Sequence, residues 1–314
     1  MTLVLRIGLE DWGRCRFAVS PLHETAAGLR ALQKPSGLAD TAGLPWAEGL
    51  RELDRVAYAP LLALMPHGRW GVDFLTPPPT GPADAIDDEL TRATATDPVQ
   101  VAVEIARCRQ VQGLAPDDVD PERRRDELVG LLHRAWDEWL APRWPRLRDV
   151  LDADVARRSA RVAGGGLAAV LVDLSPQVHL VDGAITVPGP DHQVDLGGRG
   201  LLLMPSGLNR GTGAMWDPPW HPTLHYPATG RSQPPDTDPA ALARLLGATR
   251  AALLAALTAP ATTSGLAVRC GVPLSTASDH LSVLRRSGLV RAVRRRHAVE
   301  HTRTALGDAL VAAA

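Results

Sequence analysis

Two hydrophobic patterns divide the chain before residue 230. Over most of residues 21–162, apolar side chains recur three and four positions apart, which is the spacing of amphipathic helices. This spacing predicts helices over about 21–32, 46–64, 84–110 with a break at Asp97-Pro98, 121 to at least 139, and 145–162. Between Gln177 and Tyr226, short apolar runs alternate with Gly, Pro and Asp, which predicts four or five short strands. With an opening strand at Leu3 to Ile7, we expect an N-terminal helical domain with a small mixed β-sheet.

The clearest element of this region begins at Asp120. Aspartate is a preferred N-cap residue, and Pro121 suits the first helical position. Six apolar residues then share one helical face: Leu128, Leu131, Leu132, Ala135, Trp136 and Trp139. We therefore predict a buried helix that carries two tryptophans. Two interruptions are also predicted, an exposed loop at Thr76–Pro82 and a helix end at Gly164-Gly165-Gly166.

A domain boundary is predicted at residues 228–239, ATGRSQPPDTDP, which lack large apolar side chains. We divide the chain into a sensor or dimerisation domain at 1–230, a linker at 231–238 and a second domain at 239–314. The second domain is predicted to contain, in order, a helix from Pro239 interrupted at Gly247, a short helix from Thr262 or Thr263, a helix capped by Ser275, two strands around a basic turn, and a helix capped by Thr304. This order is that of a winged helix-turn-helix domain. The predicted fold class is α+β and mostly helical.

The stretch VPLSTASDHLSVLRRSGLV, residues 272–290, carries the candidate chemistry of the second domain. At about 100° per residue, Ala277, Leu281 and Leu284 lie on one face, and the opposite face is small and polar, which suits entry into a major groove. The candidate DNA-binding residues of this helix are Ser275, Thr276, Ser278, Asp279, His280, Ser282 and Arg286. Asp279 is expected either to accept a hydrogen bond from a cytosine amino group or to discriminate against other bases. His280 lies at the edge of the face, where core packing and DNA contact are equally favoured.

The turn between the two predicted strands is strongly basic. Arg294, Arg295, Arg296 and His297 form a compact cationic tip, which is expected to contact phosphates or the minor groove. From residue 240 onward, ten arginines stand against three carboxylates, a net charge of +7. Because the whole chain carries −1, the remainder carries −8. A basic end on an acidic body is typical of a nucleic-acid-binding domain joined to another domain.

The segments GVPLSTASDHLSVLRRSGLV and RRRHAVEHTRTALGDAL resemble the DNA-binding domain of the ArsR/SmtB family of bacterial repressors, over about 239–314. The resemblance implies a homodimer that represses transcription until a signal relieves it, with Ser278 and Asp279 facing bases. Metal-sensing members carry a Cys-x-Cys pair, whereas this chain has Cys270 alone, and its last helix lacks the His and Glu of other metal sensors. The whole layout resembles regulators of GC-rich bacteria in which a long N-terminal domain of unassigned function precedes the winged helix. That likeness rests on residues 141–178 and on DLGGRGLLLMPS.

Several kinds of site are not expected. Three dispersed cysteines form no CxxC pair, so neither a disulfide framework nor a zinc site is predicted, and a cytoplasmic location fits. No signal peptide core and no apolar run of about 18 residues is present, so no membrane association is expected. His221 and His225 lie four apart, about 13 Å along a strand, which favours a loop histidine and a strand histidine over a metal site. No cofactor is predicted.

Four tryptophans are candidates for an effector site. Trp136, Trp139, Trp216 and Trp220 could line a pocket for a flat organic molecule, although aromatic side chains at helical spacing are more often core. No catalytic arrangement is recognisable, so the protein is not expected to be an enzyme. We predict a sequence-specific regulator, a repressor that binds a double-stranded DNA operator as a homodimer and whose N-terminal domain binds a small-molecule effector or supplies dimer contacts. The alternatives are an enzyme with a DNA-binding tail and a ligand-binding protein whose winged helix makes only protein contacts.

Overall fold

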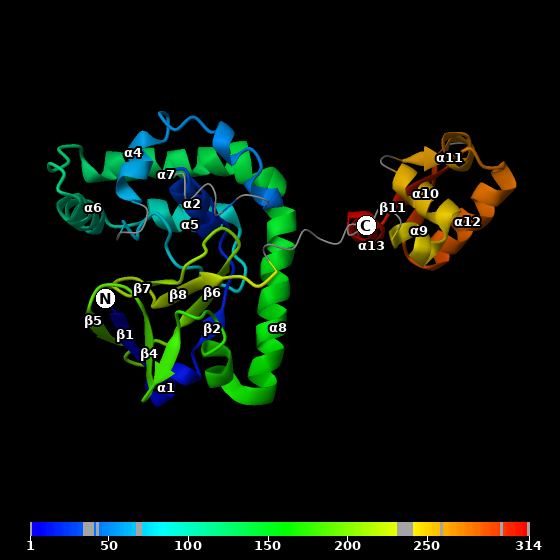
Figure 1. Ribbon diagram of the computed structural model, residues 1–314. Helices are drawn as coiled ribbons and strands as arrows, with labels where there is room; N and C mark the ends of the chain where they lie inside the picture. The colour runs from blue at the N-terminus through cyan, green and yellow to red at the C-terminus, as the bar shows by residue number, and fades with distance from the viewer. Residues whose placement is uncertain are drawn as a thin grey trace. The chain divides into compact units, whose positions relative to one another are not determined.

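The chain folds into two compact units, Met1–Ser232 and Gln233–Ala314, in a computed structural model (Figure 1). The structure describes residues 2–33, 41, 44–66, 71–230, 241–257, 260–295 and 298–312. The fold class is α+β and mostly helical with small mixed sheets, as the sequence predicts. The predicted linker at 231–238 lies outside the described residues. Within the described ranges, no helix is long and apolar enough to cross a membrane.

The helical half of the N-terminal unit forms around one core. Its helices are α2 (Pro21–Ala31), α4 (Ala59–Leu64), α5 (Ile86–Thr94), α6 (Pro98–Gln112) and α7 (Pro121–Ala135). Side chains at the helix starts accept backbone hydrogen bonds: Ser20 from the N–H of His23, Asp97 from Val99, and Asp120 from Arg123. The helices predicted at 21–32, at 84–110 with its break, and from Pro121 are confirmed.

Two predictions for this half are wrong. A single helix at 46–64 does not form, because Gly49 takes a left-handed conformation at φ 75° and divides the segment into two short 3-10 turns, Pro45–Ala47 and Leu50–Glu52, before α4. The Thr76–Pro82 segment is irregular as predicted, but its first residues are buried rather than exposed. Val72, Phe74 and Leu75 insert into the core just before it and draw it inward.

The connection after α7 runs through a π turn (Trp136–Leu140) and a 3-10 turn (Ala141–Arg143) into α8 (Trp144–Leu171). This long helix passes both the helices and the strands of the unit (Figure 1). Its first turns pack in the helical core through Leu147 and Leu151, and its last turn packs in a second core through Val170 and Leu171. The predicted helix end at Gly164-Gly165-Gly166 is only an interruption, since Gly166 has φ 74° and the helix resumes after it.

The strands form two four-stranded sheets. In the first, the order is β3 (His179–Val181), β4 (Ala184–Pro188), β1 (Thr2–Arg6), β5 (His192–Asp195). In the second, the order is β2 (Arg16–Phe17), β6 (Leu202–Ser206), β8 (Thr223–Pro227), β7 (Gly213–Met215), and β2, β6 and β8 run parallel. A short helix, α1 (Leu9–Trp12), joins β1 to β2. Six strands therefore lie between residues 177 and 227, where four or five were predicted, and both sheets also recruit a strand from the first 17 residues.

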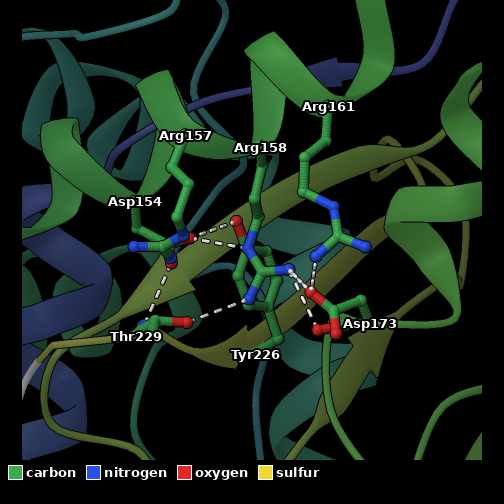
Figure 2. A network of polar contacts seen from close by, with 7 residues as sticks. All are labelled: Asp154, Arg157, Arg158, Arg161, Asp173, Tyr226 and Thr229. Atoms are coloured by element: carbon green, nitrogen blue, oxygen red, sulfur yellow. Dashed lines mark hydrogen bonds and ion pairs between the residues drawn. The ribbon is translucent and has the colours of Figure 1, made fainter. Parts of the chain in front are cut away.

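A buried polar network joins α8 to the end of β8 (Figure 2). Asp154, fully buried, accepts hydrogen bonds from Arg158 Nε (2.9 Å), the Tyr226 hydroxyl (3.0 Å) and the backbone N–H of Thr229 (3.0 Å), and it also pairs with Arg157. The Arg158 guanidinium lies 4.7 Å from the centre of the Tyr226 ring. The network fixes the last described residues of the N-terminal unit to its longest helix.

The C-terminal unit contains α9 (Ala241–Leu246), α10 (Ala248–Ala256), α11 (Thr263–Cys270), α12 (Leu274–Arg286) and α13 (Ala305–Ala312). Its three-stranded sheet has the order β10 (Val290–Arg295), β11 (Ala298–Arg303), β9 (Ala261–Thr262), and all pairs are antiparallel. The predicted break at Gly247 and the predicted cap at Thr304, which accepts from the N–H of Gly307 at 3.1 Å, are confirmed. A separate core of Leu253, Leu254, Leu266, Leu281 and Leu284 holds the helices together.

Candidate nucleic-acid interface

The turn between α11 and α12 is set by three local features. Thr262 caps α11 by accepting a hydrogen bond from the N–H of Gly265 at 3.2 Å. Gly271 ends that helix in the left-handed conformation at φ 64°, which glycine adopts without steric cost. Pro273 then precedes the first residue of α12. These features produce a helix, a tight turn and a second helix, the arrangement of DNA-binding helix-turn-helix motifs.

The inner face of α12 is the predicted one. Ala277, Leu281 and Leu284 are buried against the core of the unit, as the helical spacing predicts. The predicted N-cap is wrong, because α12 begins at Leu274 and Ser275 lies inside its first turn with no side-chain capping bond. Pro273 has an extended ψ of 147° and a φ of −57°, so the chain enters the helix two residues earlier.

The outer face of α12 is polar, and its side chains form no hydrogen bonds or ion pairs with other described residues. Ser275, Ser278, Asp279 and Arg286 are exposed, and Thr276, His280 and Ser282 are partly exposed. Within the described ranges, none of these seven side chains makes a hydrogen bond or ion pair. Their donors and acceptors are therefore available to a partner. His280 keeps the border position that the sequence predicts.

The strands β10 and β11 form an antiparallel hairpin beside this helix in the sequence. In its register Arg294 lies opposite Val299 and Arg295 opposite Ala298, so the backbone places both arginines at the end of the hairpin. Arg296 and His297, the other predicted residues of the tip, lie outside the described residues. Farther down the strand, Arg291 donates to the Thr302 hydroxyl at 2.9 Å and is exposed.

From the sequence alone, His301 on β11 would be expected to face solvent or phosphate like the rest of the hairpin, and this expectation is wrong. It is buried, and its Nε2 lies 3.0 Å from the hydroxyl of Thr263 at the start of α11. Burial, with a smaller effect of Arg285, lowers the pKa of His301. The residue therefore joins the hairpin to the helix-turn-helix.

The four tryptophans predicted to line an effector pocket do not form one cluster. Trp136 and Trp139 are buried in the helical core and Trp220 packs against it, whereas Trp216 belongs to the core of the sheets. The Trp139 ring fills the space above Gly28, where a Cβ would lie 2.1 Å from it. The indole N–H of Trp220 donates to Glu104 at 2.7 Å. Trp136 and Trp139 are therefore packing residues, the alternative that helical spacing favours.

A polar cluster that the sequence did not reveal lies in the N-terminal unit. We call His23, Arg30, Asp73 and His225 the Arg30 cluster. The rings of His23 and His225 have centroids 4.8 Å apart, and Arg30 is within electrostatic range of the other three residues. Burial and then Arg30 lower the pKa of His225 to about 3. The seven-residue spacing of His23 and Arg30 on one helix was the only sequence signal, since the other members come from distant segments.

The described residues give little support to a metal site at the histidines or to a reactive thiol at Cys15 or Cys108. His221 lies in a loop and His225 in β8, as predicted, and the described residues contain no group of three or more candidate metal ligands. Burial raises the pKa of the Cys15 thiol to about 11 and also raises that of Cys108, so both thiols are held in the unreactive neutral form.

Comparisons with known families separate the two units. Residues 245–293 match a family described as a helix-turn-helix domain, and residues 83–232 match a family of unknown function, DUF5937. No curated protein and no solved structure matches the chain. The helix-turn-helix match covers α10 to most of β10, and so includes the whole polar face of α12. Match and geometry together support a DNA-binding transcription regulator.

Proposed function

We propose that this protein is a sequence-specific repressor that reads DNA with α12. The observation that carries the proposal is the outer face of this helix, where seven polar side chains have no partner among the described residues. A surface that is small, polar and free of intramolecular bonds matches the major groove, which offers hydrogen-bond donors and acceptors on base edges. Ser278 and Asp279, which are both exposed, are the proposed base-reading residues.

The hairpin is the proposed wing of a winged helix-turn-helix domain. Its end carries Arg294 and Arg295 in the described backbone, and Arg296 and His297 follow in the sequence. We assign this tip to phosphate or minor-groove contacts, which add affinity for any sequence and weaken with salt. The helix would then supply sequence specificity, and the hairpin would supply affinity for DNA of any sequence.

The proposed assembly is a homodimer on an operator with dyad symmetry. Helix-turn-helix dimers bind half-sites about one helical turn apart, roughly 34 Å, because each recognition helix enters the groove on the same side of the duplex. The N-terminal unit is proposed to bind a small-molecule effector or to supply dimer contacts. Its buried polar groups support the first role.

A genome-wide pull-down with the purified full chain, followed by mobility shifts on the recovered fragments and on its own upstream region, tests the proposal. We expect a small set of sites with a shared palindrome and an affinity at least about a thousandfold above that for random DNA. Binding at low salt to every sequence alike contradicts a specific repressor. Transcription from a recovered promoter, measured with and without the protein, separates repression from activation.

One observation favours a second function, protein contacts through the same unit. Val268 and Leu274 are 85% and 56% exposed and line a shallow, mostly apolar groove at the helix-turn-helix, together with Ala267 and Val272. Exposed apolar grooves commonly mark protein interfaces. If the pull-down retains no DNA while Val268→Ser abolishes binding of a protein, this second function replaces the first.

A further inference from the structure

The Arg30 cluster lacks the internal partners that buried charges normally have. In the described part of the chain, the Arg30 guanidinium makes no hydrogen bond and no ion pair, and it interacts with Asp73 only through electrostatics. The Asp73 carboxyl and the His225 ring make no hydrogen bond there either. Charges that are largely removed from water are usually paired and hydrogen-bonded, because even partial burial costs them hydration. Burial lowers the pKa of Arg30, which reflects this cost.

Two neighbouring carboxylates, Glu104 and Asp217, are by contrast paired. Glu104 accepts hydrogen bonds from the backbone N–H groups of Asp73 (2.7 Å) and Phe74 (2.8 Å), from Gln100 (2.8 Å) and from Trp220 (2.7 Å). Asp217 pairs with Arg107. These contacts hold Glu104 and Asp217 beside the cluster, whereas the side chains of Arg30, Asp73 and His225 make no hydrogen bond in the described part of the chain.

The cluster is reachable from solvent. Arg30, Asp73 and His225 each keep an intermediate exposed fraction, whereas Glu104 and His23 are buried. The position in the sheet also fits a ligand site. Helix α2, which carries His23 and Arg30, follows the carboxyl end of β2. Asn209, which follows the parallel strand β6, lies 3.1 Å from His23. In sheets with parallel strands, ligands bind beyond the carboxyl ends of the strands.

The charges indicate which ligand would fit. Burial, with the carboxylates of Glu104 and Asp217, raises the pKa of Asp73 well above its usual value and so favours its neutral form. Burial likewise favours the neutral forms of His23 and His225 by lowering their pKa. The guanidinium is then the charge that needs a counter-ion. A guanidinium pairs with a carboxylate through two parallel hydrogen bonds, and a neutral imidazole can donate a third.

We propose that the Arg30 cluster binds a small organic molecule through its carboxylate, which pairs with Arg30 and accepts a hydrogen bond from His225. The inference rests on the proposed effector-binding role of the N-terminal unit and names the chemical class of the effector. Asp73, and Trp220 beside Glu104, would contact the remainder of the ligand. The assignment differs from the predicted tryptophan pocket, because a cation and two imidazoles, not stacked rings, select the ligand.

Acetate tests the proposal because it supplies the carboxylate alone. The melting temperature of the full chain is measured in about 100 mM acetate and in chloride of equal ionic strength, for the wild type, Arg30→Met, Arg30→Lys and Arg123→Met. Arg123 is an exposed arginine on α7 and serves as the matched control. We expect acetate to raise the melting temperature of the wild type and of Arg123→Met by about 2–4 °C relative to chloride. Arg30→Met should lose this shift.

Arg30→Lys keeps the charge but lacks the planar fork, so it should lose most of the shift as well, and it provides a second variant if Arg30→Met does not fold. Equal melting temperatures of the wild type in acetate and chloride overturn the proposal. So does an undiminished acetate shift in both Arg30 variants. Because no DNA is present, failure of DNA binding in the pull-down and failure of carboxylate binding are separate results.

Discussion

The two units place their polar side chains in opposite ways. In the C-terminal unit, the polar groups of α12 lie on the outside and make no bonds within the described chain. In the N-terminal unit, Asp154, Arg158, Glu89 and Glu104 are buried, and partners from distant segments hold them. An outward polar face can be replaced with little effect on folding, because water already solvates it. A buried polar side chain cannot be replaced in this way, because its partners would be left buried and unpaired. The comparison predicts that substitutions in one unit change DNA affinity and in the other change stability.

The largest effect is expected from Asp154→Ala. Removing this carboxylate leaves Arg158 buried without its partner and breaks the bonds from Tyr226 and Thr229, so the free energy of unfolding should fall by about 3–5 kcal/mol. Urea denaturation measures the change. Asp152→Ala is the matched control, because Asp152 lies on the same helix, is half exposed and pairs only with Arg148, so about 0.5 kcal/mol is expected. Equal losses in the two variants would contradict the comparison.

Replacing Arg294, Arg295 and Arg296 with alanine should weaken binding to every DNA sequence without changing stability. Each phosphate contact contributes about 0.9 to the slope of log K against log salt, so three lost contacts reduce affinity by up to about a thousandfold at 50 mM salt. Mobility shifts at several salt concentrations, on operator and random DNA, measure the slope. A loss confined to the operator would assign base reading, not phosphate contact, to the hairpin.

Acidification should distinguish His225 from its exposed counterparts. The pKa of His225 is about 3 in the folded unit and about 6.5 when unfolded, so the unfolded state binds the proton first and stability is lost as pH falls below about 6.5. Between pH 7 and pH 5 this amounts to about 2 kcal/mol. Glu89, whose pKa is raised to about 8, acts in the opposite direction over the same range, so the wild type alone is not informative.

The informative quantity is therefore the difference between His225→Gln and the wild type. The variant should become more stable relative to the wild type as the pH is lowered, measured by denaturation at pH 7 and pH 5. His280→Gln on α12, where the histidine is partly exposed, is the control and should show no such trend. Parallel pH curves for wild type and His225→Gln would show that His225 is not held neutral by the fold.

The smallest effect is expected from Asp279→Ala. A single carboxylate accepting from one cytosine amino group discriminates by about 1 kcal/mol, below a bidentate contact, so preference at one base position should relax about tenfold or less. Selection of binding sites from a random library, for the variant and the wild type, measures this. Ser282→Ala is a suitable comparison, since this residue is less exposed. An equal change at every position would remove Asp279 from base reading.

The same contrast explains what the sequence could predict. The helix-turn-helix depends on signals that lie within a few residues of each other, such as Thr262, Gly271 and the spacing of Ala277, Leu281 and Leu284, and these were read correctly. The Ser275 cap failed because Pro273 starts the helix earlier. In the N-terminal unit, the Arg30 cluster and the Asp154 network join residues from one end of the unit to the other. Periodicity reports which face of an element is buried, but not which element it meets.

The place of β1 in its sheet has a consequence for synthesis of the protein. This strand, Thr2–Arg6, lies between β4 and β5 and pairs with Ala184–Pro188 and His192–Asp195. Its partners leave the ribosome roughly 10 to 40 s after it does, at about 5–20 residues per second. The apolar run of β1 must wait unpaired for that time, while the DNA-binding unit, whose contacts are local, can close as soon as it emerges. Nascent chains should therefore depend on chaperones chiefly through their first strand.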